Sequence, residues 1–448
     1  MNFENIQPQK PKKVDLVNTP IHRNTTKDNE DYLPPLGLGY IGTAIEKSGN
    51  KVEIIDCVQE RVGVKQTIER LNNSDAEFVG VNVFSQNLEL VKEILLSLDK
   101  DKKILIGGQA RKFLQEELLS LPTKNETIII IGEGEKIVPE IINGKIEETP
   151  LLEDDNKKVY FIGQNSKYYL KDISNLELDR NLLIQNISKN HYGQKEIAII
   201  TSRGCPFDCA FCGGARGLNP NTKPRQKNSE SIISEIIQLQ KIYPHIQSIR
   251  ILDDLFLKNA DGILQATKIF SKFTNLSWIS MIHATSLGTD PMIVQKMKNS
   301  GCKEVFIGIE SGSENIRDYI NKIGSVELVV DSIKKLLTAG IDVKGYFIFG
   351  FPNETKEDFE KTFNLAEHIK EISTKTNGAF RTSVFKFRPY HGTKIYNDLL
   401  SQGKNILPMK PSIDLGLKNR DQFNFDAGNF SNESDETLHE YIKKTQNL

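Results

Sequence analysis

Cysteine and long apolar runs are scarce in this chain of 448 residues, and each scarcity disfavours a class of protein. The odd count of five cysteines argues against the disulfide framework of a secreted protein. No apolar run approaches the roughly 20 residues that a membrane-spanning helix needs. The N-terminus is polar and rich in lysine, without the apolar stretch of a signal peptide. We therefore expect a cytoplasmic protein that does not enter a membrane.

Neither sign of charge predominates, because 58 basic residues balance 59 acidic ones. A balanced chain without a basic tract is not expected to bind nucleic acid. Hydrophobic residues make up 38% of the chain and charged residues 26%, which is typical of a globular protein. At about 150 residues per domain, the length suggests two or three domains.

Residues 1–145 alternate short apolar strands with helical stretches, which predicts an α/β domain with a doubly wound, Rossmann-like parallel sheet. The expected strands are Val14–Val17, Val52–Asp56, Phe78–Val83, Ile104–Gly107 and Ile128–Ile131. Gly107-Gly108 lies at the end of one of these strands, and Gly132-Glu133-Gly134 directly follows another. That is the carboxyl edge, where such sheets bind ligands.

A second alternation follows residues 146–190, which we expect to be a linker with a short hairpin around Val159–Leu170. The expected strands of the second domain are Ile197–Thr201, Ser248–Leu252, Leu276–Ile282, Glu304–Ile309, Val343–Phe349 and Ser383–Phe387. Six strand–helix units are too few for a closed eight-stranded barrel. They predict a partial (β/α)6 barrel of the TIM type over 191–400, followed by a short C-terminal segment over 401–448.

Three cysteines, Cys205, Cys209 and Cys212, lie within eight residues on a loop that leaves the first strand of this barrel. The spacing C-x3-C-x2-C lets three thiolates bind one iron–sulfur cube and leaves its fourth iron without a protein ligand. Such an open iron suits a catalytic cluster, whereas an electron carrier normally uses four cysteines. Zinc is the alternative, but it prefers four ligands, and the nearest downstream histidine is His245.

At these residues the chain resembles the radical S-adenosylmethionine superfamily, whose signature places an aromatic residue, here Phe211, before the last cysteine. The resemblance implies that a [4Fe–4S] cluster binds S-adenosylmethionine through its open iron. Reduction of the cluster would then cleave the C5′–S bond and give a 5′-deoxyadenosyl radical. The resemblance also implies an external electron donor of the flavodoxin or ferredoxin type.

Residues at other strand ends match the same superfamily. Asp253-Asp254 resembles its contact for the methionine ammonium, although paired aspartates after a strand are often only a turn or a cap. Glu310-Ser311 resembles its ribose-binding segment, with a buried structural carboxylate as the alternative. Tyr390 lies in a P-Y-x-G-T run that resembles the segment near the adenine. These matches imply cofactor contacts, and no catalytic residue is assigned.

The first domain resembles the cobalamin-binding domain that precedes the radical domain in many of these enzymes. Gly37, Gly107-Gly108 and Gly132-Glu133-Gly134 follow in the expected order and would contact cobalamin. The histidine that ligates cobalt in many such domains has no counterpart in the matching segment Asp56–Arg61, and the only histidine before residue 190 is His22. The resemblance therefore implies cobalamin with an open lower face, or a domain that has lost the cofactor.

Together these features imply a cobalamin-dependent methyltransferase that acts on an unactivated centre of a small molecule or a peptide. The alternative within the superfamily is a cobalamin-independent cyclisation or rearrangement, with a structural or substrate-binding first domain. A methylthiotransferase is disfavoured, since its first domain needs three further cysteines and here has only Cys57. A non-catalytic iron–sulfur or zinc protein, from another class, would leave Asp253 and Glu310 unexplained.

Overall fold

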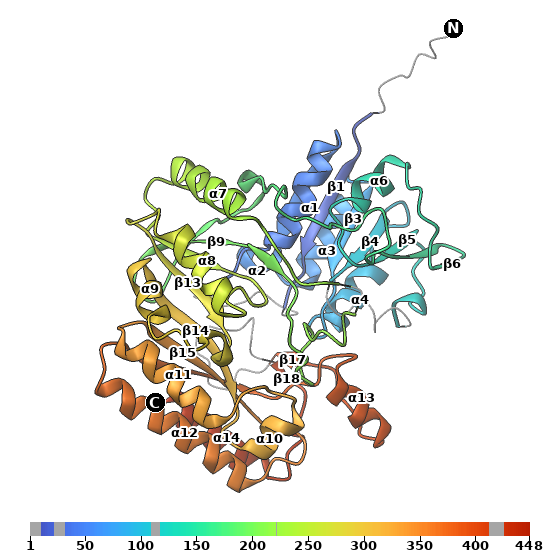
Figure 1. Ribbon diagram of the computed structural model, residues 1–448. Helices are drawn as coiled ribbons and strands as arrows, with labels where there is room; N and C mark the ends of the chain where they lie inside the picture. Colours follow the sequence, from blue (N-terminus) through green and yellow to red (C-terminus); the bar gives the residue numbers. More distant parts are fainter. Residues whose placement is uncertain (1–9, 22–31, 109–116, 221, 412–424) are drawn as a thin grey trace. The chain divides into compact units, whose positions relative to one another are not determined.

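The computed structural model describes residues 10–21, 32–108, 117–220, 222–411 and 425–448, and it contains two compact units. The described part of the first unit covers residues 10–21, 35–108, 117–170 and 176–184. The second unit holds the remaining described residues. Each unit has its own seven-stranded sheet and its own apolar core (Figure 1).

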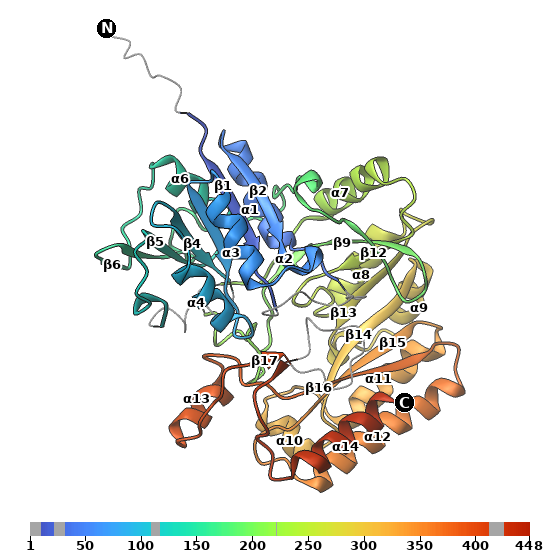
Figure 2. The same ribbon diagram turned by 180° about the vertical axis from the view of Figure 1, so that it is seen from behind.

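The first unit is built on a sheet with the order β2-β1-β3-β4-β5-β7-β6, and Figure 2 labels β2, β1, β4, β5 and β6 among these strands. Its strands are β1 (Lys13–Asn18), β2 (Lys51–Asp56), β3 (Phe78–Asn82), β4 (Lys103–Gly107), β5 (Thr127–Ile131), β6 (Leu152–Asp154) and β7 (Lys157–Phe161). All neighbouring strands pair in parallel except β6 and β7. The predicted doubly wound parallel sheet is therefore confirmed.

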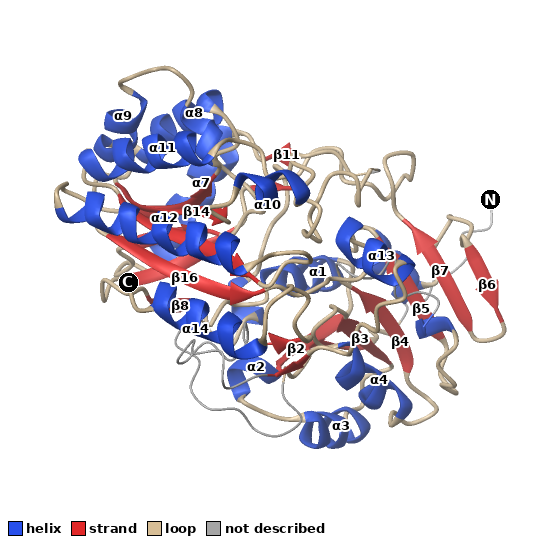
Figure 3. Cartoon of the chain, turned by 90° about the horizontal axis from the view of Figure 1, so that it is seen from below, coloured by secondary structure: helices blue, strands red, loops and turns tan. Residues whose placement is uncertain are grey.

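Helices cover both faces of this sheet. They are α1 (Leu36–Lys47), α2 (Cys57–Glu60), α3 (Val64–Asn73), α4 (Leu88–Leu96) and α6 (Ile137–Asn143). Figure 3 shows α1 on one face and α3 and α4 on the other. Every residue of β5 is buried, which explains its continuous isoleucine run, because a parallel sheet with two covered faces needs apolar side chains on both.

The stretch expected to be a linker contributes strands instead. The hairpin lies earlier than predicted, at β6 and β7, and β7 extends the first sheet by pairing in parallel with β5. β8 (Ile187–Lys189) pairs antiparallel with β9 and belongs to the second sheet. β6 and β8 escaped prediction, because β6 is fully exposed and β8 is at most partly buried, so neither shows an apolar pattern.

The second unit contains a sheet with the order β16-β15-β14-β13-β12-β9-β8. Its other strands are β9 (Lys195–Ile199), β12 (Ser248–Ile251), β13 (Ser277–Ile282), β14 (Cys302–Glu310), β15 (Asp342–Phe349) and β16 (Phe380–Lys386). These six pair in parallel and match the six predicted strands, so the partial barrel is confirmed.

Helices connect the strands of the second sheet. They are α7 (Ser229–Ile242), α8 (Ala260–Phe270), α9 (Ile293–Asn299), α10 (Glu314–Tyr319), α11 (Val326–Thr338) and α12 (Lys356–Thr374). Figure 3 shows α8, α9, α11 and α12 on one face of the sheet. The carboxyl ends of the parallel strands all meet at one edge, which is where the predicted site residues lie.

The C-terminal segment completes the second core. It contains α13 (Lys394–Ser401), β17 (Lys410–Pro411), β18 (Phe425–Asp426) and α14 (Asp435–Gln446). Leu438 and Ile442 of α14 are buried in the same core as the barrel strands. Across the described ranges, we find no helix with both the length and the apolar character needed to cross a membrane.

Candidate functional site

The three predicted cluster ligands lie on a loop at the carboxyl edge of the second sheet. The short strand β10 (Ser202–Arg203) leads into this loop and pairs with β11 (Arg225–Gln226) beyond it. Cys205, Cys209 and Cys212 have free thiols that are partly buried. The pairing of β10 with β11 ties the two ends of the loop together and so holds the thiols next to the strand ends.

The three thiols lie close enough for the charge on one to affect the pKa of another. Burial raises the pKa of the Cys212 thiol to about 12, and negative charge on Cys209 and Cys205 adds to the rise. A backbone amide opposes this rise in pKa, because Gly214 N donates a hydrogen bond to Cys212 Sγ at 3.4 Å. Iron binds the thiolate, so the bound metal and such amide donors both favour loss of the thiol proton.

This donor set fits an iron–sulfur cube. Among the residues that the structure describes, no three His, Cys, Asp or Glu side chains are spaced to hold a single metal ion. A cube distributes its protein ligands over separate irons, and hydrogen bonds to the cysteine sulfurs are one means by which proteins tune it. The fit rests on the three neighbouring thiols and on the amide that donates to one of them.

The residues after α10 form hydrogen bonds with the cluster loop. Ile320 O accepts a hydrogen bond from Ala210 N at 2.8 Å, and Asn321 Nδ2 donates to Asp208 O at 2.7 Å. Asn321 has a φ of 53°, in the left-handed region that asparagine tolerates better than most residues. The loop is therefore held in the middle as well as at its ends.

Lys322 follows in the same turn, and its charge acts on the thiols. Burial raises the pKa of Cys205 and of Cys209, and the charge of Lys322 opposes both rises. Lys322 Nζ lies 3.2 Å from Glu310 Oε1, and each of these two side chains is only 9% exposed. No sequence pattern indicates this role, because a lysine after a short helix is normally solvated.

Glu310 ends β14 in a strained conformation, with a φ of 65°. The pairing of β14 with β15 shifts register between Gly308 and Glu310, and such a bulge redirects a side chain. A Cβ on Gly308 would lie 2.2 Å from Glu310 Oε1, so glycine makes room for the carboxylate. The nearby Arg317 donates instead to the carbonyl oxygens of Ile309 and Gly324, at 2.7 and 3.0 Å.

The two aspartates after β12 have different partners. Asp253 is 5% exposed and accepts hydrogen bonds from Thr201 N, Thr201 Oγ1 and Ser202 Oγ at 2.6 to 2.7 Å. Burial raises the pKa of Asp253 to about 6. Asp254 is exposed and accepts a hydrogen bond from Gly204 N at 2.9 Å. Asp253 thus fixes the approach to the cluster loop, and Asp254 presents a carboxylate beside the loop.

The other predicted contacts of S-adenosylmethionine take part in packing. Ser311 is fully buried, and its Oγ lies 3.1 Å from Thr362 Oγ1 of α12. Phe211 packs edge-on against Phe351, with ring centroids 5.6 Å apart. Tyr390 is half-buried just before α13. Ser311 therefore has its hydroxyl directed to a helix, whereas Tyr390 remains at a strand end.

In the first unit, two predicted glycines are required by the fold itself. Gly108 has a φ of 109°, and a Cβ there would lie 2.1 Å from Val83 O. Gly132 has a φ of 128°, and a Cβ there would lie 2.4 Å from Ile162 O. Backbone packing alone accounts for glycine at both positions.

At the other predicted glycines, an added Cβ would meet either open space or the flexible end of a side chain. Among the described residues, a Cβ on Gly37, at the start of α1, or on Gly107, at the end of β4, would meet no atom within 4 Å. A Cβ on Gly134 would meet the side chains of Ile41 and Val138, at 3.1 and 3.3 Å. Glu133 precedes it in the turn after β5. Open space beside Gly37 and Gly107 at the carboxyl edge fits a large cofactor such as cobalamin.

A polar network that no sequence pattern indicates lies at this edge. Asn18 Nδ2 donates a hydrogen bond to Asp56 Oδ1 at 2.8 Å, and Thr19 N donates to Asn82 Oδ1 at 3.3 Å. Asn87 Nδ2 donates to Asn82 O at 3.0 Å. The network joins the ends of β1, β2 and β3, and only their adjacency in the sheet could have revealed it.

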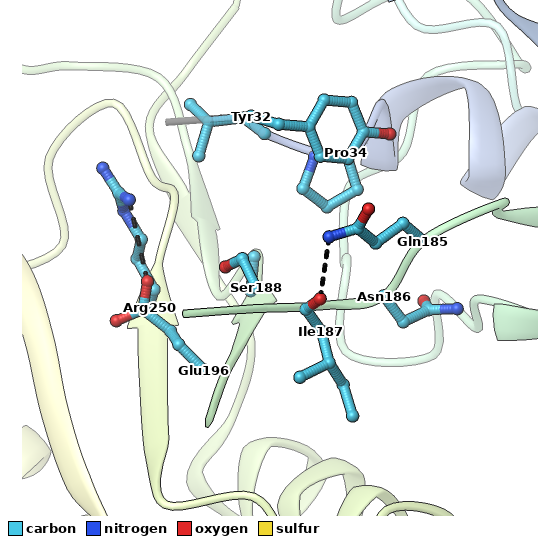
Figure 4. Close-up of a pocket in the computed structure, with 10 residues that line it drawn as sticks. Tyr32, Pro34, Gln185, Asn186, Ile187, Ser188, Glu196 and Arg250 are labelled. Atoms are coloured by element: carbon cyan, nitrogen blue, oxygen red, sulfur yellow. Dashed lines mark hydrogen bonds and ion pairs between the residues drawn. The ribbon is translucent and has the colours of Figure 1, made fainter. Parts of the chain in front are cut away.

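A small pocket in the second unit contains none of the predicted site residues. Figure 4 shows Tyr32 and Pro34 on one side of it and β8 on the other. Arg250 lies at its margin, with Nη1 3.6 Å from Glu196 Oε1. Because the pocket adjoins β8, β9 and the middle of β12, we do not assign the cluster chemistry to it.

Comparison with known families identifies both units. Residues 199–366 match the family model of the radical SAM superfamily, and residues 28–142 match that of the B12 binding domain. The protein is a radical SAM enzyme with a B12-binding domain. Its cofactors are therefore a [4Fe–4S] cluster, S-adenosylmethionine and cobalamin.

Individual relatives agree with this assignment. The chain is 25% identical to the uncharacterized methyltransferase PH0819 of Pyrococcus horikoshii, over 75% of this chain and 73% of that protein. It is 24% identical to the cytidylyl-2-hydroxyethylphosphonate methyltransferase of Streptomyces wedmorensis, over 82% and 78%. The methyltransferase TsrM of Kitasatospora setae, solved with cobalamin and a [4Fe–4S] cluster, shares the fold at a TM-score of 0.61 and 16% identity, over 88% and 75%.

Proposed function

We propose that this radical SAM enzyme is a cobalamin-dependent methyltransferase acting on an unactivated centre of a small molecule or a peptide. The observation that carries the proposal is the pairing, in one chain, of a three-thiol loop with a B12-binding unit whose carboxyl edge is open beside Gly37 and Gly107. When bound, the cluster and S-adenosylmethionine supply a 5′-deoxyadenosyl radical, and cobalamin supplies the methyl group.

In this proposal, the strand ends of the second unit bind and orient S-adenosylmethionine. Asp254, exposed beside the cluster loop, accepts hydrogen bonds from the methionine ammonium. Glu310, redirected by its bulge, accepts from the ribose hydroxyls. Lys322 offsets negative charge on the thiolates, and Asp253 fixes the backbone that leads to them.

The first unit would hold cobalamin at the carboxyl edge of its sheet. Within the described part of this unit the sequence contains no histidine, and His22 lies outside the described residues. The described residues of this unit would therefore offer cobalt no histidine at the glycine-lined edge. The glycines that leave room there are Gly37 and Gly107.

The inner face of the second sheet carries charged side chains, among them Arg381 paired with Glu304 at 2.6 Å, so this face favours a polar substrate over an apolar one. Two arginines and a lysine, Arg250, Arg381 and Lys344, lie 5.3 to 5.9 Å from the ring centroid of Phe306. Phe306 alternates along β14 with the core residues Val305 and Ile307, so these cations lie on the face opposite the helices. Methyl transfer also needs an external electron donor, which we propose is of the flavodoxin or ferredoxin type.

The proposal can be tested without the natural substrate. Protein reconstituted anaerobically with iron and sulfide would be mixed with hydroxocobalamin, a strong chemical reductant and S-adenosylmethionine carrying a trideuterated methyl group. We expect 5′-deoxyadenosine and labelled methyl on the cobalamin, both measured by mass spectrometry. Formation of 5′-deoxyadenosine by protein that takes up no cobalamin would overturn methyl transfer and favour the cobalamin-independent alternative.

The matched control is Cys209→Ala. This variant should still take up cobalamin, because the cysteine lies in the other unit, but it should release no 5′-deoxyadenosine. Nucleoside release equal to that of the natural protein would show that the three thiols do not hold the active cluster.

A further inference from the structure

His283 is a buried side chain that the proposed function does not yet use. It follows β13 and caps the short helix η2 (Ala284–Leu287), where Thr285 N donates to its Nδ1 at 3.3 Å. Thr285 Oγ1 lies 2.8 Å from the same nitrogen. An Nδ1 that accepts the amide hydrogen carries no proton of its own, so the proton of the neutral ring lies on Nε2.

The surroundings keep this ring neutral. Burial lowers the pKa of His283 to about 3, and the charges of Lys322 and Arg317 add to the effect. The Nε2–H group is therefore a hydrogen-bond donor, and it does not gain a second proton under the conditions in which the enzyme would be studied. What it offers to a ligand is one N–H in a fixed direction.

That N–H has no partner among the described residues. The residue is 6% exposed, and Nε2 is buried without a hydrogen bond. Leaving a buried donor unsatisfied costs about 1–3 kcal/mol, so buried polar groups nearly always meet an acceptor. The ring stacks on Phe207 of the cluster loop, with ring centroids 4.1 Å apart and an angle of 26° between planes. The unsatisfied donor is thus next to the loop that carries the thiols.

We propose that His283 is a further cofactor-binding residue, whose Nε2–H donates a hydrogen bond to the carboxylate of S-adenosylmethionine. In the sheet, β13 lies between β12, which leads to Asp254, and β14, which ends in Glu310. Both neighbouring strand ends present carboxylates. These suit the ammonium and the ribose hydroxyls of S-adenosylmethionine, but they would repel its carboxylate. The end of β13 instead presents a donor, with the cations Lys322 and Arg317 within electrostatic reach.

Two substitutions separate this role from a structural one. His283→Gln can place an amide N–H near the position of Nε2, whereas His283→Asn keeps only a group near Nδ1, the atom that meets Thr285. Binding of S-adenosylmethionine to anaerobically reconstituted protein would be measured by equilibrium dialysis. We expect the Asn variant to bind about tenfold or more weakly, as for loss of a hydrogen bond to a charged group, and the Gln variant to recover most of the affinity.

The opposite pattern would overturn the proposal. Recovery by Asn and not by Gln would show that the ring serves only the turn at Thr285, and normal binding by both variants would show that no bond is made. The iron content and thermal midpoint of each variant would be measured alongside, so that a loss of folding is not taken for a loss of binding.

The choice of the carboxylate has its own test. Decarboxylated S-adenosylmethionine lacks this group, so the natural protein should prefer the intact cofactor. In His283→Asn that preference should shrink by about tenfold. An unchanged preference would mean that His283 does not meet the carboxylate. This inference rests on the proposed function, and the two failures differ: if cluster-loaded natural protein binds no S-adenosylmethionine at all, the function fails and not merely this contact.

Discussion

Glu354 is a buried carboxyl that organises the turn after β15. Its Oε2 accepts hydrogen bonds from Gly350 N at 2.7 Å and from Phe351 N at 2.9 Å. Its Oε1 is buried and has no partner within the described ranges. Burial raises the pKa of Glu354 to about 8, so the side chain holds the turn best as a neutral acid.

This raised pKa predicts a dependence of stability on pH. The ordinary value is 4.5, so between pH 4.5 and about 8 the folded state binds the proton that the unfolded state has lost. Stability contributed by this group is therefore present at low pH and falls as the pH rises through that window. We expect urea unfolding of the natural protein to show a loss on the order of a few kcal/mol between pH 5 and pH 9.

The isosteric variant Glu354→Gln should lose most of this pH dependence, because an amide cannot ionise. Parallel stability curves for the two proteins across this range would contradict the prediction. The comparison needs no cofactor, so it can be made on protein without a cluster.

Contacts between helices, strands and loops hold the site together as much as individual side chains do. The turn after α10 reaches the cluster loop across 113 residues of sequence, through the hydrogen bond from Asn321 Nδ2 to Asp208 O. Asn321→Gly should lose that bond but keep the left-handed backbone, whereas Asn321→Ala should lose the bond and add about 1 kcal/mol of backbone strain.

We therefore expect both Asn321 variants to retain less iron after reconstitution than the natural protein, and the Ala variant also to unfold at a lower temperature than the Gly variant. Iron and sulfide analysis together with thermal unfolding would measure the two effects. Full iron content in Asn321→Gly would show that the hydrogen bond to Asp208 O does not matter for cluster retention.

The end of β4 offers a matched pair of adjacent glycines. Gly107→Val places its side chain in open space, so the fold should tolerate it while the space for cobalamin shrinks. Gly108→Ala forces a Cβ to within 2.1 Å of Val83 O at a positive φ, so it should destabilise the first unit by about 1 kcal/mol or more.

Visible absorption after incubation with hydroxocobalamin and thermal unfolding would separate the two effects. Weaker uptake with an unchanged unfolding temperature is expected for Gly107→Val. Normal uptake by that variant would remove Gly107 from the proposed cofactor site.

Secondary structure could be predicted well, because burial leaves a clear pattern along each core strand. The six barrel strands and the five strands of the first sheet from β1 to β5 all carry apolar runs, and the thiol spacing marks the cluster loop directly. Lys322 and the network around Asn82 show no such pattern in the sequence. Their roles depend on which strand ends and turns meet in space, and those meetings join residues far apart in the chain.

The two separate cores predict that cobalamin stabilises only part of the molecule. Trp278 is the single tryptophan, and it is fully buried in the core of the second unit, stacked on Phe270. Its fluorescence therefore reports unfolding of that unit, while circular dichroism reports both. Cobalamin at about 100 times its Kd should stabilise the unit that binds it by roughly 2.7 kcal/mol.

We accordingly expect added cobalamin to shift part of the denaturation curve measured by circular dichroism and to leave the tryptophan midpoint in place. Equal shifts in both signals would show that the units unfold together. A shift in neither signal would contradict cobalamin binding.

The path of the chain between the units has a consequence for biosynthesis. Residues 32–34 and 171–175 belong to the second unit, although the first unit uses the sequence between them. Domains generally fold in the order in which they leave the ribosome. The first sheet can thus close while Tyr32 and Pro34 still await the neighbours they have beside β8 and β9, more than 150 residues later. Until β8 and β9 leave the ribosome, the nascent chain would therefore hold a finished first unit and an early segment whose neighbours have not yet been made.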